Sequence, residues 1–213
     1  MFLQHISIVN FKNHLEGSFD FSSDINCFTG NNGIGKTNLL DAIYYLSFSK
    51  SFFNSIDSQN INFDHDFFII QGEYNLDENP EKVYIGMKRG KKKTVKRNNK
   101  VYKRLSDHIG LFPLVMVSPA DVNLITDGSE VRRKFVDGVI SQFDSIYLDN
   151  LLKYNKALVQ RNALLKSFSE NRFFDEESLN LWDMQLEQYA IPVYQTRKSF
   201  LDEFIPSFRS ITN

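Results

Sequence analysis

The spacing of apolar residues predicts strands in the first part of the chain. Alternation of apolar and polar positions, enriched in β-branched and aromatic residues, is typical of strands buried on one face. It predicts strands over residues 2–9, 19–21, 25–29, 67–74, 82–87 and 111–117, with a hairpin over 94–102 that turns at Asn98 and Asn99. Asn tolerates the left-handed backbone that tight hairpin turns require.

Helical spacing follows a glycine-rich stretch and returns in the second half of the chain. Directly after residues 30–35, apolar residues recur at helical intervals, at Leu39, Leu40, Ile43 and Leu46. From about residue 121 the pattern is helical, with a polar break at 167–177 and prolines that predict kinks or ends in the last helix, Pro192 and Pro206. We therefore expect an α/β lobe over residues 1–120 and a helical second lobe over 121–213.

Composition predicts a globular protein of a reducing compartment. Hydrophobic residues make up 42% and charged residues 24%, ordinary proportions that favour a buried core. The single cysteine, Cys27, cannot form an internal disulfide, and its apolar surroundings predict a buried thiol. No stretch reaches the ~18 apolar residues of a membrane helix, and the N-terminus has no secretory pattern. We expect a cytoplasmic protein without membrane contact.

Positive charge is concentrated in one segment. The net charge is -1, yet residues 88–104 hold ten Lys or Arg and no Asp or Glu. Such a concentration is a common footprint of a polyanionic partner. The alternative is a solvated hairpin whose lysines protect an exposed sheet edge. The candidate DNA contacts are Lys91, Lys92, Lys93, Lys96 and Arg97.

The motif G-x-x-x-x-G-K-T lies between a predicted strand and a predicted helix. Its glycines permit positive φ and let amide N–H groups close around phosphate oxygens. The N-terminus of the following helix faces the same anion. The candidate nucleotide-binding residues are Gly30, Asn31, Asn32, Gly33, Ile34, Gly35, Lys36, Thr37 and Asn38.

Two side chains of the motif predict Mg-ATP as the ligand. Lys36 is placed to reach the β- and γ-phosphates, and the Thr37 hydroxyl to coordinate Mg²⁺. Hydrolysis usually also needs a strand that ends in a carboxylate. Asp121 follows an apolar run, but Pro119 ends strand geometry before it, which favours a capping or loop role. The four histidines have no metal-ligand spacing.

Several patterns, in one order along the chain, resemble the RecF family of bacterial DNA-gap repair ATPases in the ABC and SMC superfamily. They are NFKNH at residues 10–14, GNNGIGKTN at 30–38, LDAIY at 40–44, SPADVNLI at 118–125, RRKFVD at 132–137, QRNALL at 160–165 and LWD at 181–183. The resemblance implies an ABC-type head, with a mixed sheet around the phosphate-loop helix and a helical second lobe.

The family resemblance also implies a function and partners. Heads of this superfamily dimerise around two ATP molecules, and RecF proteins bind DNA at single-strand gaps and assist recombinase loading with the mediators RecR and RecO. Lys12 matches a position where relatives place a basic residue near the nucleotide, although a strand-end lysine is the alternative. The family tends to have Ser-Phe-Arg where this chain has Ser51-Phe52-Phe53, so no arginine role is carried over.

Two expectations concern activity. The sequence has no signature motif and no strand ending in paired acids, so we expect an incomplete head that binds ATP without appreciable turnover and without an ATP-sandwiched dimer. The alternative function is a P-loop kinase or phosphotransferase with a helical lid. Convergent Arg and carboxylate side chains near the loop would favour it.

Overall fold

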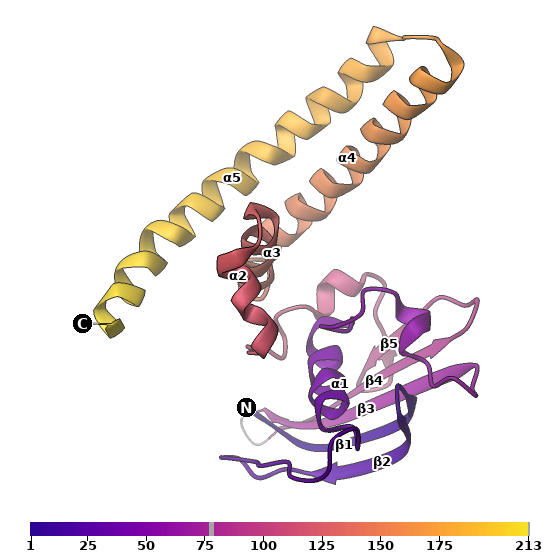
Figure 1. Cartoon of the computed structure of the whole chain (residues 1–213), viewed down its shortest axis with the longest axis vertical. Coiled ribbons are helices and arrows are strands. Elements are labelled where there is room, and N and C mark those ends of the chain that lie inside the picture. Colours follow the sequence, from indigo (N-terminus) through magenta and orange to yellow (C-terminus); the bar gives the residue numbers. More distant parts are fainter. Residues whose placement is uncertain (77–78, 213) are drawn as a thin grey trace. The chain divides into compact units, whose positions relative to one another are not determined.

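The chain divides into two compact units. The computed structural model describes residues 1–76 and 79–212 and separates Met1–Met116 from Val117–Asn213 (Figure 1). The first unit holds the sheet and the glycine loop, and the second is helical. The chain thus has the predicted fold class, an α/β part with a phosphate-loop helix followed by a helical part.

The first unit is built on a six-stranded sheet of order β2-β1-β3-β4-β5-β6. Its strands are β1 (Phe2–Phe11), β2 (His14–Asp20), β3 (Phe67–Leu76), β4 (Asn79–Lys88), β5 (Thr94–Arg97) and β6 (Lys100–Val101). The expected mixed sheet is antiparallel throughout in the described part of the chain. The predicted hairpin turn is confirmed, because Asn98 and Asn99 have φ of 47° and 66° between β5 and β6.

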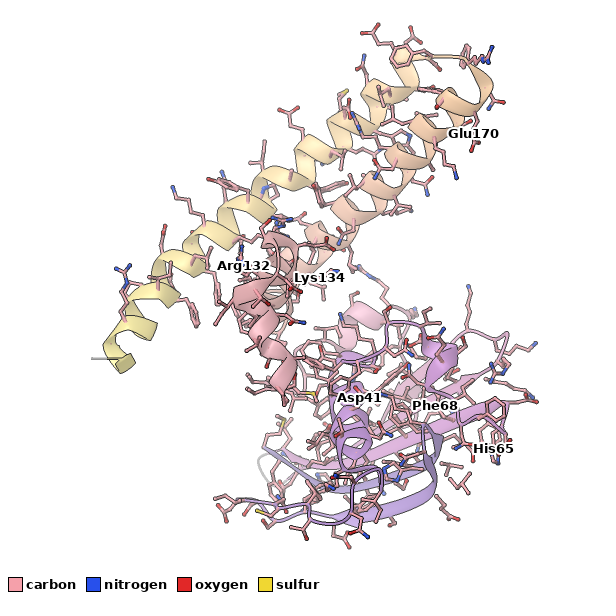
Figure 2. The ribbon with its side chains drawn as sticks, in the orientation of Figure 1. Asp41, His65, Phe68, Arg132, Lys134 and Glu170 are labelled. Atoms are coloured by element: carbon pink, nitrogen blue, oxygen red, sulfur yellow. The ribbon has the colours of Figure 1, made fainter. Side chains whose placement is uncertain are left out.

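One face of the sheet packs against helix α1 (Lys36–Phe48). Alternate strand residues point to this face, and they form a core with the apolar side of α1. The central members are Ile6, Ile8, Phe68, Ile70, Val83, Ile85, Val95, Leu39, Ala42, Tyr45 and Leu46. Asp41 of α1 and Phe68 of β3 are labelled in Figure 2. We call the opposite side of the sheet its outer face.

Two predicted strands are wrong. Residues 25–29 and 111–117 contain no strand in the structure, and neither segment pairs with a strand among the described residues. Their apolar side chains do not share one buried face: Ile25 is 86% and Val117 82% exposed, whereas Phe112 is 2% exposed and belongs to the core. Cys27 is exposed as well, which corrects its predicted burial. A strand needs a hydrogen-bonded neighbour, which local sequence does not specify.

The second unit is a helical hairpin with shorter helices before it. Its helices are α2 (Asn123–Thr126), α3 (Ser129–Ile140), α4 (Ser145–Asn171) and α5 (Glu176–Thr212). Short 3₁₀ turns also occur along the chain, at η1 (Asp57–Asn60), η2 (Leu105–His108) and η3 (Pro119–Val122). Figure 2 labels Arg132 and Lys134 on α3 and Glu170 near the end of α4. Helix α5 continues through Pro192 and Pro206, so neither proline ends it.

Polar contacts fasten the base of this hairpin. Arg197 of α5 donates hydrogen bonds to both carboxylate oxygens of Asp137 on α3, at 2.7 and 2.8 Å. Tyr147 of α4 donates its hydroxyl to the same carboxylate, and burial followed by this hydrogen bond raises the pKa of Tyr147. Farther along, Arg161 and Asp183 join α4 to α5. None of the described helices combines the length and apolar character needed to cross a lipid bilayer.

Candidate phosphate-binding site

The backbone of the glycine loop has the predicted conformation. Gly30, Gly33 and Gly35 have φ of 145°, 83° and 109°, values that residues with a Cβ adopt only with strain. Helix α1 begins at Lys36, so its unpaired N-terminal amides and positive dipole end face the loop. A hollow of about 220 Å³ opens there, lined by Asn32, Gly33, Gly35, Lys36, Thr37 and Asn38. This is the geometry of an anion site.

The Lys36 ammonium lies over the loop. Its Nζ donates hydrogen bonds to the carbonyl oxygens of Gly30 at 2.7 Å and Asn31 at 2.9 Å. Thr37, in the first turn of α1, is exposed at the hollow, where its hydroxyl is accessible to a magnesium ion. Lys36 would hold the terminal phosphates of a bound nucleotide, and Thr37 would coordinate Mg²⁺. Ile34, at the crest of the loop, is 61% exposed.

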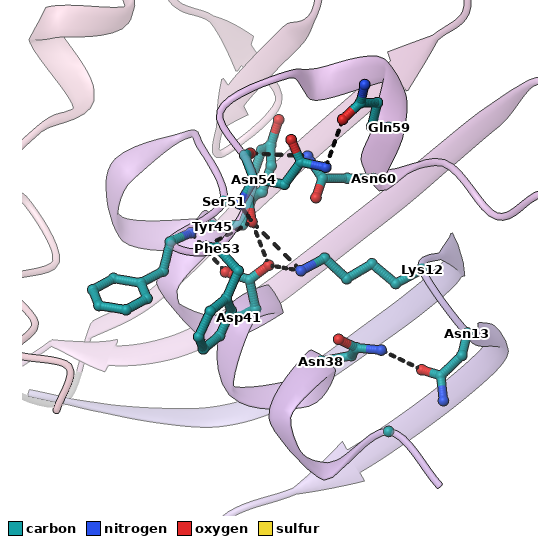
Figure 3. A network of polar contacts seen from close by, with 12 residues as sticks. Lys12, Asn13, Asn38, Asp41, Tyr45, Ser51, Phe53, Asn54, Gln59 and Asn60 are labelled. Carbon is teal, nitrogen blue, oxygen red and sulfur yellow. Dashed lines mark hydrogen bonds and ion pairs between the residues drawn. The ribbon is translucent and has the colours of Figure 1, made fainter. Parts of the chain in front are cut away.

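The turn between β1 and β2 braces the loop. Asn13 donates from Nδ2 to the Gly33 carbonyl at 2.9 Å. It accepts at Oδ1 from Asn38 Nδ2 at 2.7 Å (Figure 3). His14 Nε2 lies 3.0 Å from the Gly35 carbonyl. Because a carbonyl only accepts, the His14 tautomer must carry its proton on Nε2. These hydrogen bonds thus hold the loop at Gly33 and Gly35 and hold the first turn of α1 at Asn38.

Close packing requires glycine at position 35, in addition to the requirement set by its positive φ. A Cβ on this residue would lie 2.6 Å from His14 Nε2 and 2.8 Å from Asn13 Oδ1. Any side chain at this position would therefore displace the brace, even apart from the strain of its positive φ. The loop and the β1–β2 turn form one packed unit.

Removing the brace tests its contribution to binding. Asn13→Ala should weaken ATP affinity about fivefold and lower the free energy of unfolding by about 1 kcal/mol, since one net hydrogen bond has about that value. Asn171→Ala is the matched control, because Asn171 makes a comparable amide-to-carbonyl bond with Ser167 in the helical unit. Calorimetric titration with ATP gives the affinity. Lower stability with unchanged ATP affinity would make Asn13 a purely structural residue.

Lys12 lies in a buried ion pair in this structure. Its Nζ is 2.5 Å from Asp41 Oδ2, and the two side chains are 15% and 0% exposed. Asp41 also accepts from the Ser51 hydroxyl at 2.6 Å and the Phe52 amide at 2.7 Å. Figure 3 shows the ammonium directed at this cluster. The expected contact between Lys12 and the nucleotide stays a prediction.

Two of the five candidate DNA contacts point toward the α1 side of the sheet and hold carboxylates there. Lys93 is 9% exposed and donates to Asp57 at 2.7 Å, to the Tyr45 hydroxyl at 3.2 Å and to the Ser49 carbonyl. Arg97 forms a two-bonded pair with Glu81 at 2.7 and 2.8 Å, and this hydrogen bonding lowers the pKa of the Glu81 carboxyl. In this structure neither charge is free to meet a phosphate.

The other three candidates surround a second hollow. Lys91, Lys92 and Lys96 line a cavity of about 300 Å³ over β3, β4 and β5. We call it the outer-face hollow, since the strand residues that line it include Phe67, Ile69, Tyr84, Gly86, Thr94 and Lys96, which alternate with those of the core. The five candidate side chains therefore lie on two faces of the sheet: two on the α1 side, and three at the outer-face hollow.

Asp121 has the capping role. Its carboxylate accepts from the Ser118 amide at 2.7 Å, and the Ser118 side chain reciprocates in a capping box at η3. The part of the chain that the structure describes contains no group of three or more His, Cys, Asp or Glu side chains suited to hold a metal.

The sequence patterns contained signals for residues that the prediction missed. Asp41 interrupts the apolar face of the helix, and a charge at such a position is buried only with partners. Asn13 and His14 follow a strand at a tight turn, a position that is typical of loop-binding side chains. The lysine that pairs with Asp41 and the loop that the turn braces are distant in sequence, so neither partner could be identified.

The fold and the loop together define a nucleotide-binding P-loop domain. Residues 5–203 match the family model of the AAA domain, and the chain belongs to that family. Within it, the chain is homologous to the DNA replication and repair protein RecF. It is 57% identical to RecF of Phocaeicola vulgatus over 99% of this chain and 56% of that protein, and 51% identical to RecF of Flavobacterium johnsoniae over 98% and 58%. The chain thus spans little more than half the length of these curated relatives.

Solved structures agree with this assignment. The recombination mediator protein RecF-ATP of the RecFOR pathway superposes with a TM-score of 0.87 at 34% identity, covering 94% of this chain and 54% of that chain. A structure concerning ATP-driven dimerisation of SMC ATPases gives a TM-score of 0.53 at 17% identity, covering 68% of this chain and 100% of that chain. That second likeness shows a shared fold.

Proposed function

We propose that the glycine loop binds Mg-ATP. The observation that carries the proposal is the braced loop itself, with three positive-φ glycines, Lys36 and Thr37 around one hollow at a helix N-terminus. The similarity to a structure of RecF-ATP supports the choice of nucleotide. In this assignment the loop amides and Lys36 hold the phosphates, and Thr37 coordinates magnesium.

We further propose that the protein is an ATP-dependent DNA-binding protein of recombinational repair, acting in the cytoplasm. Homology to RecF supports a role in DNA replication and repair. The finer proposal is binding at junctions of single- and double-stranded DNA, homodimerisation with ATP in the full-length protein, and recombinase loading with RecR and RecO. The RecF relatives are longer than this chain, which covers 56% and 58% of their length.

Residues 1–213 should bind ATP without appreciable turnover. Among the described residues, no carboxylate lines the hollow at the loop, and the nearest acid along α1, Asp41, is held by Lys12. Hydrolysis requires a carboxylate or an equivalent group to organise magnesium and the attacking water. The lining also speaks against the kinase alternative, since it contains no arginine and no acid that could hold a second substrate.

The proposal predicts that DNA affinity depends on the unpaired lysines of the basic segment. Replacing Lys91, Lys92 and Lys96 by Ala should flatten the slope of log affinity against log salt by about 2–3 units, because each phosphate contact contributes about 0.9. Fluorescence anisotropy with a junction of single- and double-stranded DNA, across a salt series, measures the slope.

The control carries the same change in charge at paired positions. Lys134, Lys153 and Lys166 each lie within 4.0 Å of a carboxylate one helical turn away. Their replacement by Ala should leave the slope unchanged, since their charges are already compensated. An equal effect of both triple variants would show that net charge, and no particular surface, attracts DNA.

A further inference from the structure

We infer that the outer-face hollow binds an unpaired nucleotide of single-stranded DNA, by stacking on Tyr84 and Phe67 and by neutralising phosphates with the surrounding lysines. The inference rests on the proposed function, because it assigns to one surface the single-stranded part of the DNA. It goes further in naming aromatic residues that a purely electrostatic DNA contact does not need.

The outer-face hollow is lined by positive charge. Lys88, Lys91, Lys92 and Lys96 line it, and no carboxylate does so among the described residues. None of these four lysines has an ion pair with a described side chain. By contrast, Lys93 and Arg97 on the other face are neutralised by Asp57 and Glu81. Four cations of the basic segment without an ion pair therefore surround one concave surface, which fits an anion.

Aromatic side chains lie between these cations. Tyr84 of β4 lies against Gly86, where a Cβ would be only 2.6 Å from the tyrosine hydroxyl and 3.0 Å from two ring carbons. Glycine at this position lets the ring lie over the strand. Lys96 Nζ is 5.0 Å from the centroid of this ring, and Phe67, on the neighbouring strand, is 38% exposed. Two rings on a sheet surface ringed by lysines form a platform for bases.

The size of the hollow also fits one nucleotide. The hollow measures about 300 Å³. This is the lower end of the range for small-ligand sites, roughly 300–1,000 Å³, and suits one base with its sugar. Paired bases in a duplex present only their edges and phosphates, so a duplex could use the lysines but not the rings. The combination of cations, aromatic rings and this volume favours an unpaired nucleotide over a duplex.

The test separates stacking from charge. Tyr84→Leu should lower affinity for a 20-nucleotide oligo-dT about tenfold, as expected for the loss of one stacked base, and leave affinity for a blunt duplex unchanged. Tyr84→Phe keeps the ring and should bind oligo-dT as the unaltered chain does. The triple Ala variant at Lys91, Lys92 and Lys96 should weaken both DNA forms. Anisotropy titrations at fixed salt give all affinities, and ATP binding by each variant shows that the loop remains intact.

Photocrosslinking provides a second measurement that does not depend on a foldable variant. Oligo-dT carrying one 5-iodouracil should crosslink to Tyr84 or Phe67, as identified by mass spectrometry of the digested chain. Duplex binding with no effect of Tyr84→Leu and no crosslink at either ring would overturn this inference and leave the proposed function standing. Equal affinity for poly-glutamate and oligo-dT, unaffected by Tyr84→Leu, would overturn it in favour of an acidic peptide. Absence of binding to any DNA would contradict the proposed function itself.

Discussion

Lys36→Ala should weaken ATP binding about 10- to 100-fold and leave adenosine binding unchanged, since hydrogen bonds to charged groups contribute about 1.5–3 kcal/mol and this lysine addresses only phosphates. In the structure its ammonium is held over the loop by the carbonyls of Gly30 and Asn31, within reach of the hollow. A bound triphosphate would offer the ammonium a charged acceptor in place of these neutral ones. Isothermal titration of both variants with ATP and adenosine measures the difference.

Two controls make the Lys36 result specific. Lys134→Ala removes the same charge from the helical unit, where Lys134 pairs with Glu130, and should leave ATP affinity unchanged. Lys36→Arg retains the charge with a different shape and should bind ATP more weakly than the unaltered chain, because arginine and lysine are not interchangeable at a tight site. Equal ATP affinity in Lys36→Ala and the unaltered chain would contradict the proposed phosphate contact.

Asp41→Ala should cost the first unit about 3–5 kcal/mol of unfolding free energy, because removing one partner of a buried ion pair leaves the other charge uncompensated. The substitution would also leave the Ser51 hydroxyl and the Phe52 amide without their acceptor. Joint replacement, Lys12→Met with Asp41→Leu, should recover the part of the loss that comes from the uncompensated charge, since apolar side chains of similar volume often replace such pairs without cost. If the losses of unfolding free energy in the single variants Lys12→Met and Asp41→Leu add up to the loss in the double variant, the pair is not coupled.

The measurement must report on the first unit alone. Trp182, the single tryptophan, lies in α5, so its fluorescence follows the helical unit. Hydrogen exchange of the α1 amides should therefore become faster in Asp41→Ala, while the tryptophan emission and its denaturation midpoint stay constant. A shift in the tryptophan transition of the same size would indicate that the two units unfold together.

Features whose determinants are local could be predicted from the sequence. The loop and α1 were predictable because glycines, Lys36 and Thr37 act within one short segment. The Asn98-Asn99 turn was predictable for the same reason. Residues 25–29 and 111–117 have equally clear strand patterns, yet no strand forms there, because strand formation depends on a neighbour elsewhere.

The division of the basic segment shows the same limit. Lys93 and Lys96 look equivalent in a run of lysines, but Lys93, directly before β5, lies beside Tyr45, whereas Lys96, in β5, lies beside Tyr84. A shift of one residue in that register would exchange the faces. Strand pairing and distant carboxylates therefore determine which lysines of the basic segment lack an ion pair. The sequence of that segment alone specifies neither.

The length of the helical hairpin of α4 and α5 converts a small change of angle at its base into a larger displacement at its turn. With 27 residues, α4 is roughly 40 Å long at 1.5 Å per residue. The contacts of Asp137 with Tyr147 and Arg197 act as a clamp at one end, whereas the turn after Asn171 is at the other. A tilt of about 10° at the clamp would carry the far turn through about 7 Å, from the helix length alone. A small repacking around Asp137 is thus amplified at the tip.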